Sequence, residues 1–120
     1  MSKHDPVVAL RDICLYAGRA MGLAQQHRRE DLAADWQAGM LAQRVLEVLG
    51  ESVKRLPTDL RERHPQVPWR DWAGIRDRIT HGYDNIDYAI VWESLHTDAP
   101  ALLEQAKRIL FDEFGIDSTP

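Results

Sequence analysis

Apolar residues recur along most of this chain at steps of three and four positions, the spacing of one buried face on an α-helix. The pattern predicts helices over residues 7–26, 36–56, 68–81, 86–97 and 101–114, and no stretch indicates a convincing strand. A short charged segment, 27–35, offers at most one or two further helical turns. The predicted fold class is therefore all-α, an up-and-down bundle of four or five helices.

Capping and breaking residues agree with these boundaries. Asp5 suits an N-cap, and Pro6 suits the first turn of a helix. Pro57 ends the long helix, and Asp98 with Pro100 restarts or kinks the last one. The buried face expected for the long helix comprises Trp36, Met40, Leu41, Val45, Leu49, Val53 and Leu56.

Glycines inside predicted helices call for a packing reason. Gly50 costs its helix about 1 kcal/mol relative to alanine, so we expect it to contact the central helix, 68–81. Gly18 and Gly22 form a smooth strip on the first helix, for which we expect ordinary packing against another helix of the bundle.

Size and composition place the chain among soluble globular proteins. Its 120 residues predict a single domain, residues 1–120, with a core over about 7–112 and a frayed tail at 115–120. One cysteine, Cys14, excludes an internal disulfide and favours a reducing, cytoplasmic setting. No apolar run approaches the roughly 20 residues that span a bilayer, so no membrane anchoring is expected.

The net charge of −4 argues against a non-specific nucleic-acid coat protein but leaves room for a local basic site. Arg70, Arg76 and Arg78 gather in the central stretch, Trp69 to Trp92. The neighbouring Arg61 and Arg63 are expected to form a solvated face.

Within that stretch, a stripe of Trp69, Trp72, Ile75 and Ile79 predicts one buried helix face. Arg76 falls on the last turns, His81 at the end, and Gly82 suits the left-handed turn that ends a helix. Residues five apart on a helix differ by about 140° in direction. Arg76 and His81 are therefore expected to converge only around a groove or across a contact with a second copy.

These residue types suffice for RNA cleavage without a metal. Histidine exchanges protons near neutrality, so His81 can take the proton of a 2′-hydroxyl. Arginine holds phosphate through its planar fork, so Arg76 can stabilise the charge that builds on the phosphoryl oxygens. The alternative is structural: His81 favours the negative end of its helix, and Arg76 pairs with a buried acid such as Glu51. Asp77 either orients Arg76 or His81, or pairs with Arg78 in solvent.

A metal site is the competing interpretation of this chain's histidines and carboxylates. Glu93 and His96 have the i, i+3 spacing of di-iron carboxylate bundles, which need two such pairs and two further glutamates. The chain offers one pair, so neither a metal nor another cofactor is expected.

Four ordered segments carry a family resemblance. They are Leu46 to Ser52, Pro65 to Trp69, Gly74 to Tyr83 with its R-x-x-x-x-H-x-Y pattern, and Ile86 to Trp92. Over roughly residues 7 to 112 the chain resembles the HepT-like family of the HEPN superfamily. Asp77 stands where that family usually has Asn, and Ser52 where it usually has Ala.

The resemblance implies a HEPN-like bundle and a metal-independent endoribonuclease, the toxin of a toxin–antitoxin pair. It implies a homodimer in which Arg76 and His81 of both copies line one cleft, with Asp77 and Glu51 in support and Arg70 and Arg78 binding RNA. It also implies an antitoxin, a minimal (MntA-like) nucleotidyltransferase, that transfers AMP onto Tyr83. The alternative is an inactive HEPN-fold interaction module or regulatory subunit.

Overall fold

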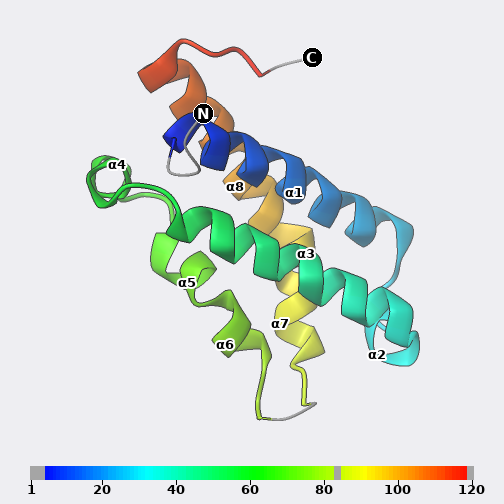
Figure 1. Ribbon diagram of the computed structural model, residues 1–120. Coiled ribbons are helices and arrows are strands. Elements are labelled where there is room, and N and C mark those ends of the chain that lie inside the picture. The colour runs from blue at the N-terminus through cyan, green and yellow to red at the C-terminus, as the bar shows by residue number, and fades with distance from the viewer. Residues whose placement is uncertain (1–4, 83–84, 119–120) are drawn as a thin grey trace.

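The computed structural model describes residues 5–82 and 85–118, and these are helical throughout most of their length (Figure 1). The helices are α1 (Pro6–Gln26), α2 (Asp31–Ala34), α3 (Trp36–Lys54), α4 (Thr58–Arg63), α5 (Trp69–Ala73), α6 (Ile75–Ile79), α7 (Tyr88–Glu93), the π-helical turn η1 (Ser94–Asp98) and α8 (Ala99–Phe114). No strand forms in the described ranges, only one isolated antiparallel bridge between Thr80 and Ile86. The all-α prediction is confirmed.

Helix α1 lies against both α8 and α3, and these three long helices enclose most of the core (Figure 1). The short helices α5 and α6 cover one side of α3, while α2 packs near its N-terminal end. Buried residues include Leu10, Ile13, Leu46, Leu49, Leu95, Leu102, Ile109 and Leu110. None of the described helices combines the length and apolar character needed to cross a membrane.

The predicted helix starts agree with the structure. The carboxylate of Asp5 accepts a hydrogen bond from the backbone N–H of Val7 at 2.8 Å, and Pro6 occupies the first turn of α1. Pro100 lies in the first turn of α8, directly after the π-helical turn η1. The widened turn η1 joins α7 to α8, so helical backbone runs on from Tyr88 to Phe114.

The single central helix predicted over 68–81 is wrong in two respects. Gly74 leaves helical geometry, with φ −96° and ψ 15°, and separates α5 from α6. Helix α6 then ends at Ile79, two residues before His81. A glycine lowers helix propensity, and the short helices bend there to follow α3. The stripe of Trp69, Trp72, Ile75 and Ile79 is nonetheless buried as its spacing predicts.

Gly50 makes the contact expected of it. A Cβ at this position would lie 2.7 Å from the carbonyl oxygen of Trp72 and 2.9 Å from Cγ2 of Ile75. The absence of a side chain therefore lets the junction of α5 and α6 approach the backbone of α3.

The N-terminal half of α3 buries a different face from the one predicted. Trp36, Met40 and Leu41 are exposed, and the buried positions are Ala38, Gly39 and Ala42. These small residues admit the backbone of α2, because a Cβ on Gly39 would meet the carbonyl oxygen of Leu32 at 2.6 Å. The expectation of ordinary packing at Gly18 and Gly22 is also wrong, since a Cβ at either would have no described atom of another helix within 4 Å.

Candidate active site

The segment after α6 is held by backbone hydrogen bonds to the segment before α7. The N–H of His81 donates to the carbonyl oxygen of Asn85 at 2.7 Å, and the N–H of Asp87 donates to that of Ile79 at 2.8 Å. Gly82 has φ +82°, a left-handed conformation that glycine adopts without strain. His81 thus lies in this short hairpin, directly after Thr80, the C-cap residue of α6.

The imidazole of His81 contacts the carboxylate of Asp87. Nε2 of His81 and Oδ2 of Asp87 lie 3.1 Å apart, and Oδ1 of Asp87 accepts the backbone N–H of Ile90 at 3.1 Å. The hydrogen bond from His81, followed by that from Ile90, holds the pKa of the Asp87 carboxyl below its ordinary value. An ionised carboxylate only accepts hydrogen bonds, so Nε2 carries the proton. In the neutral ring, Nδ1 is then left to accept one.

Asp87 lies within the segment from Ile86 to Trp92 that carries the family resemblance, but the sequence predicted no role for it beside His81. Its carboxylate does cap α7. The contact with His81 depends on the hairpin that brings residues six apart together. The helix or strand periodicity of the sequence cannot predict such a contact.

Arg76 projects from α6 beside α3. It lines a hollow of about 70 Å³ together with Arg44, Glu51 and Lys54. Within the described ranges Arg76 is exposed and makes no ion pair or side-chain hydrogen bond. Glu51 is exposed too, and its carboxylate pairs with Nζ of Lys54 at 3.3 Å. The alternative that Arg76 pairs with a buried Glu51 is therefore wrong, and the guanidinium is open to an anion.

The remaining predicted site residues are dispersed. Arg70 and Asp77 are exposed on α5 and α6, and neither lines the hollow beside Arg76. Arg78 lies near Asp98. Burial raises the pKa of the Asp98 carboxyl, and the positive charge of Arg78 lowers it. Among the described residues no hydrogen bond or ion pair joins Arg76 to His81, and Tyr83 lies outside the described residues.

His96, the candidate metal ligand, stacks on Trp92 with ring centroids 5.3 Å apart and an interplanar angle of 18°. Across residues 5–82 and 85–118, no group of three histidine, cysteine or acidic side chains is arranged to hold a metal ion. The i, i+3 pair with Glu93 therefore lacks further ligands in the described part of the chain.

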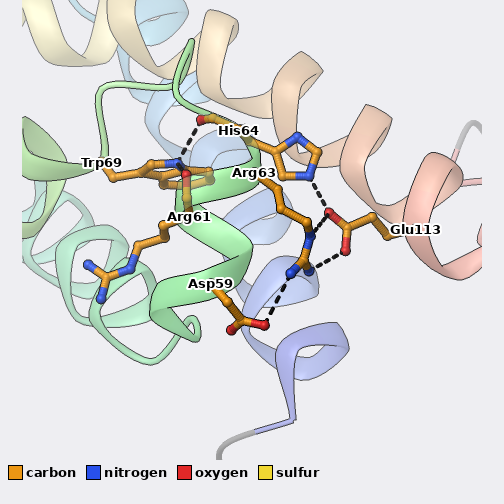
Figure 2. A network of polar contacts seen from close by, with 6 residues as sticks. All are labelled: Asp59, Arg61, Arg63, His64, Trp69 and Glu113. Atoms are coloured by element: carbon orange, nitrogen blue, oxygen red, sulfur yellow. Dashed lines mark hydrogen bonds and ion pairs between the residues drawn. The ribbon is translucent and has the colours of Figure 1, made fainter.

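A polar network tethers α4 and the following link to α8, and so fixes where α5 begins (Figure 2). Arg63 Nη2 donates to Oε1 of Glu113 at 2.6 Å, while His64 contacts the other oxygen of that carboxylate. The indole N–H of Trp69 donates to the carbonyl oxygens of Arg61, at 3.1 Å, and His64, at 2.9 Å. Arg63 is exposed, as expected of a solvated face, but its guanidinium is also held by Asp59 and Glu113, whereas Arg61 is half-buried.

The family assignment follows from comparison with known proteins. The sequence model of the family described as "Ribonuclease HepT-like" matches residues 9–109. The chain belongs to the HepT-like ribonuclease family. Its described residues form the all-α bundle expected of a HEPN-like fold, and the loop that carries His81 falls inside the matched segment.

Relatives of this HepT-like chain have names that agree with the family. A protein of Methanocaldococcus jannaschii named "Putative RNase" is 32% identical over 117 residues, covering 98% of this chain and 97% of its own length. Another "Putative RNase", from Caldanaerobacter subterraneus subsp. tengcongensis, is 46% identical over 70 residues, which is 58% of this chain and 62% of the relative.

A "Probable ribonuclease HepT" of Thermococcus cleftensis is 36% identical over 73 residues, covering 61% of this chain and 66% of the relative. No solved structure gives a significant match. These comparisons support a ribonuclease of the HEPN type.

Proposed function

We propose that this HepT-like chain is a metal-independent endoribonuclease in which His81 and Arg76 act on one phosphodiester. The single observation that carries the proposal is the contact of His81 Nε2 with the Asp87 carboxylate. It turns a half-exposed histidine into an oriented base, since the protonated nitrogen faces Asp87 and Nδ1 faces away from that carboxylate.

The first step of the reaction is removal of a proton from the RNA. Nδ1 of His81 removes it from a ribose 2′-hydroxyl, and the 2′-oxygen attacks the adjacent phosphorus. As the new P–O bond forms, the bond to the 5′-oxygen of the next nucleotide breaks. That oxygen gains a proton and leaves as a hydroxyl, so the products are a 2′,3′-cyclic phosphate and a 5′-hydroxyl end. Arg76 stabilises the negative charge that builds on the phosphoryl oxygens in the transition state.

The leaving oxygen needs a proton donor, and one chain supplies one His81. In a homodimer, His81 of the second copy in its imidazolium form supplies that proton, and solvent then restores both rings. This division of work between a base and an acid is what general acid–base catalysis requires. Asp87 serves as a positioning residue, because it holds the imidazole without touching the substrate.

The biological role proposed is that of a toxin silenced by a partner. A minimal nucleotidyltransferase would transfer AMP onto the hydroxyl of Tyr83, releasing pyrophosphate from ATP. Tyr83 follows His81 by two positions in the chain. The added phosphodiester carries a negative charge that would compete for Arg76 and repel the RNA backbone.

Product analysis tests the proposed reaction. Purified protein is incubated with a single-stranded RNA in buffer containing a chelator, and the new ends are identified by mass spectrometry. Fragments ending in 2′,3′-cyclic phosphate, absent with His81→Ala and with Arg76→Ala, are expected. Cleavage that requires a divalent metal, or that persists unchanged in His81→Ala, contradicts the mechanism.

A further inference from the structure

Two surface hollows meet at Arg44 and Glu51 on α3. The smaller is the hollow of about 70 Å³ beside Arg76. The larger, about 590 Å³, lies between α1 and α3. The two hollows flank α3, and their shared lining residues, Arg44 and Glu51, lie between them. The surface that both hollows form, from Arg76 on one side of α3 to α1 on the other, is here called the α3 furrow.

The α3 furrow has a charge opposite in sign to that of the whole chain. Among the described residues, its lining includes five basic side chains, Arg19, Arg44, Lys54, Arg55 and Arg76, against three acidic ones, Asp12, Glu47 and Glu51. The result is a surplus of two positive charges in a chain whose net charge is −4. A concave surface of one sign concentrates ions of the other, so the furrow attracts anions.

The ion pairs in the furrow leave several of its cations available. Arg55 donates to Asp12 at 2.7 Å, and this pair is the tightest. Arg44 lies 3.9 Å from Glu47 with 72% of its side chain exposed, a geometry that contributes little. Arg19 lies over the ring of Tyr16, 4.7 Å from its centroid, and has no acidic partner within the described residues.

The cations are spread along a line. Arg44, Glu51 and Arg55 follow one face of α3 at steps of seven and four, so Arg44 and Arg55 are separated by about 16 Å along the helix axis. Arg76 lies on one flank of α3, in the same hollow as Arg44, and Arg19 with Tyr16 lies on the other flank, on α1. A row of arginines beside an aromatic ring fits a phosphate backbone with its bases better than a single small anion.

We infer that the α3 furrow binds the sugar–phosphate backbone of the RNA strand next to the cleavage point. Arg76 holds the phosphate that reacts, Arg44 holds a neighbouring phosphate, and the strand continues toward Arg19 and Arg55. The inference rests on the proposed ribonuclease function, and it names Arg44 as a substrate-binding residue that sequence reasoning did not select.

Binding is measured with a fluorescently labelled single-stranded RNA of roughly a dozen nucleotides, a length within the range of single-strand sites. All proteins carry His81→Ala so that the RNA stays intact. The test variant is Arg44→Gln. The control is Arg28→Gln, which removes the same charge from an exposed arginine outside the furrow, whose ion pairs with Glu30, at 3.8 Å, and Asp31, at 3.7 Å, are as long as that of Arg44.

Arg44→Gln is expected to weaken RNA binding about tenfold, the effect of one charge-assisted hydrogen bond. It should also lower the slope of log Kd against log salt by about 0.7, the value for one phosphate on a single strand. Arg28→Gln should change neither quantity appreciably. In protein with His81 intact, Arg44→Gln should raise KM and leave kcat unchanged.

The outcomes separate this inference from the function on which it rests. If the native protein cleaves RNA but Arg44→Gln binds it like Arg28→Gln, the furrow is not the RNA path and the ribonuclease stands. If Arg44→Gln alters the sedimenting mass rather than RNA affinity, the furrow is a contact between copies, and the inference fails. If RNA binding depends on Arg44 but the native protein does not cleave RNA, the RNA-binding inference stands and the proposed ribonuclease function fails. A protein that neither binds nor cleaves RNA overturns both.

Discussion

Gly50 on α3 and Trp72 on α5 approach so closely that a Cβ on the glycine would lie 2.7 Å from the tryptophan carbonyl oxygen. That oxygen belongs to the backbone and has little room to move. The junction of α5 and α6, from which Arg76 projects, is therefore seated directly on the backbone of α3.

Gly50→Ala is expected to destabilise the protein by about 1–3 kcal/mol, because the added methyl group overpacks a fixed contact. Gly22→Ala is the matched control. It lies inside α1 with no described atom within 4 Å of its Cβ, so it should stabilise the helix by up to about 1 kcal/mol. Urea denaturation measures both, and equal midpoints for the two variants would refute the close contact.

Asp87→Asn tests the positioning of the base. Asparagine caps a helix about as well as aspartate, so α7 should keep its cap while His81 loses its ionised partner. We expect kcat for RNA cleavage to fall by about tenfold or more and KM to stay unchanged. The pH–rate profile should shift as well, which a purely structural role would not produce. Asp35→Asn, at the N-cap of α3, is the control and should leave both kinetic constants as they are.

Stability toward acid should depend on Glu113. Its hydrogen bond from Arg63, and a second contact with His64, lower the pKa of its carboxyl in the folded protein. A carboxyl with a lowered folded pKa stabilises the fold above its unfolded pKa, about 4.3, and this stabilisation is lost as the pH falls through the folded value.

Urea midpoints at pH 7 and pH 3 check this linkage. Glu113→Gln should narrow the difference between the two midpoints. Asp112→Asn, an exposed neighbour without an ion pair in the described structure, should preserve it. If Glu113→Gln shows the same difference between the two midpoints as the native protein, the contact of Glu113 with Arg63 does not contribute to the pH dependence of stability.

The protein is predicted to sediment as a dimer at micromolar concentration, because the proposed acid–base chemistry needs two copies of His81. Equilibrium sedimentation should give a mass well above the 13.8 kDa of one chain. When native protein is refolded together with inactive His81→Ala protein, mixed dimers with only one His81 should form. Cleavage activity should then fall more steeply than the fraction of native chains. A single-chain mass with full cleavage activity would contradict the two-copy mechanism.

Co-expression with an adjacent nucleotidyltransferase tests Tyr83. Intact mass should increase by one or more AMP units and RNA cleavage should disappear. Tyr83→Phe should remain unmodified and active, and His81→Ala should still accept AMP. Silencing without any mass change would instead mean that the partner covers the site.

Helix positions and one interhelical contact could be predicted from the sequence because they depend on local rules. The stripe from Trp69 to Ile79 is buried, and Gly50 meets the central segment as its position implied. The exposure of Trp36 was missed because apolar spacing does not reveal which of two faces a neighbour will cover. There the small residues Ala38 and Gly39 admit α2 instead.

The candidate site was predicted only as residue types. Arg76 and His81 were selected from their chemistry, but the break at Gly74 and the end of α6 at Ile79 changed the backbone that presents them. The partner of His81 could not be identified from spacing, since a hairpin and not a helix brings Asp87 to it.

The bridge between Thr80 and Ile86 has a consequence for how this segment tolerates change. It joins residues only six apart, so the His81–Asp87 contact assembles from neighbouring chain with little loss of loop entropy. Doubling the enclosed segment would cost only about 0.6 kcal/mol more. An insertion in this segment would therefore leave the His81–Asp87 contact largely intact, whereas replacing Gly82 would strain its left-handed backbone.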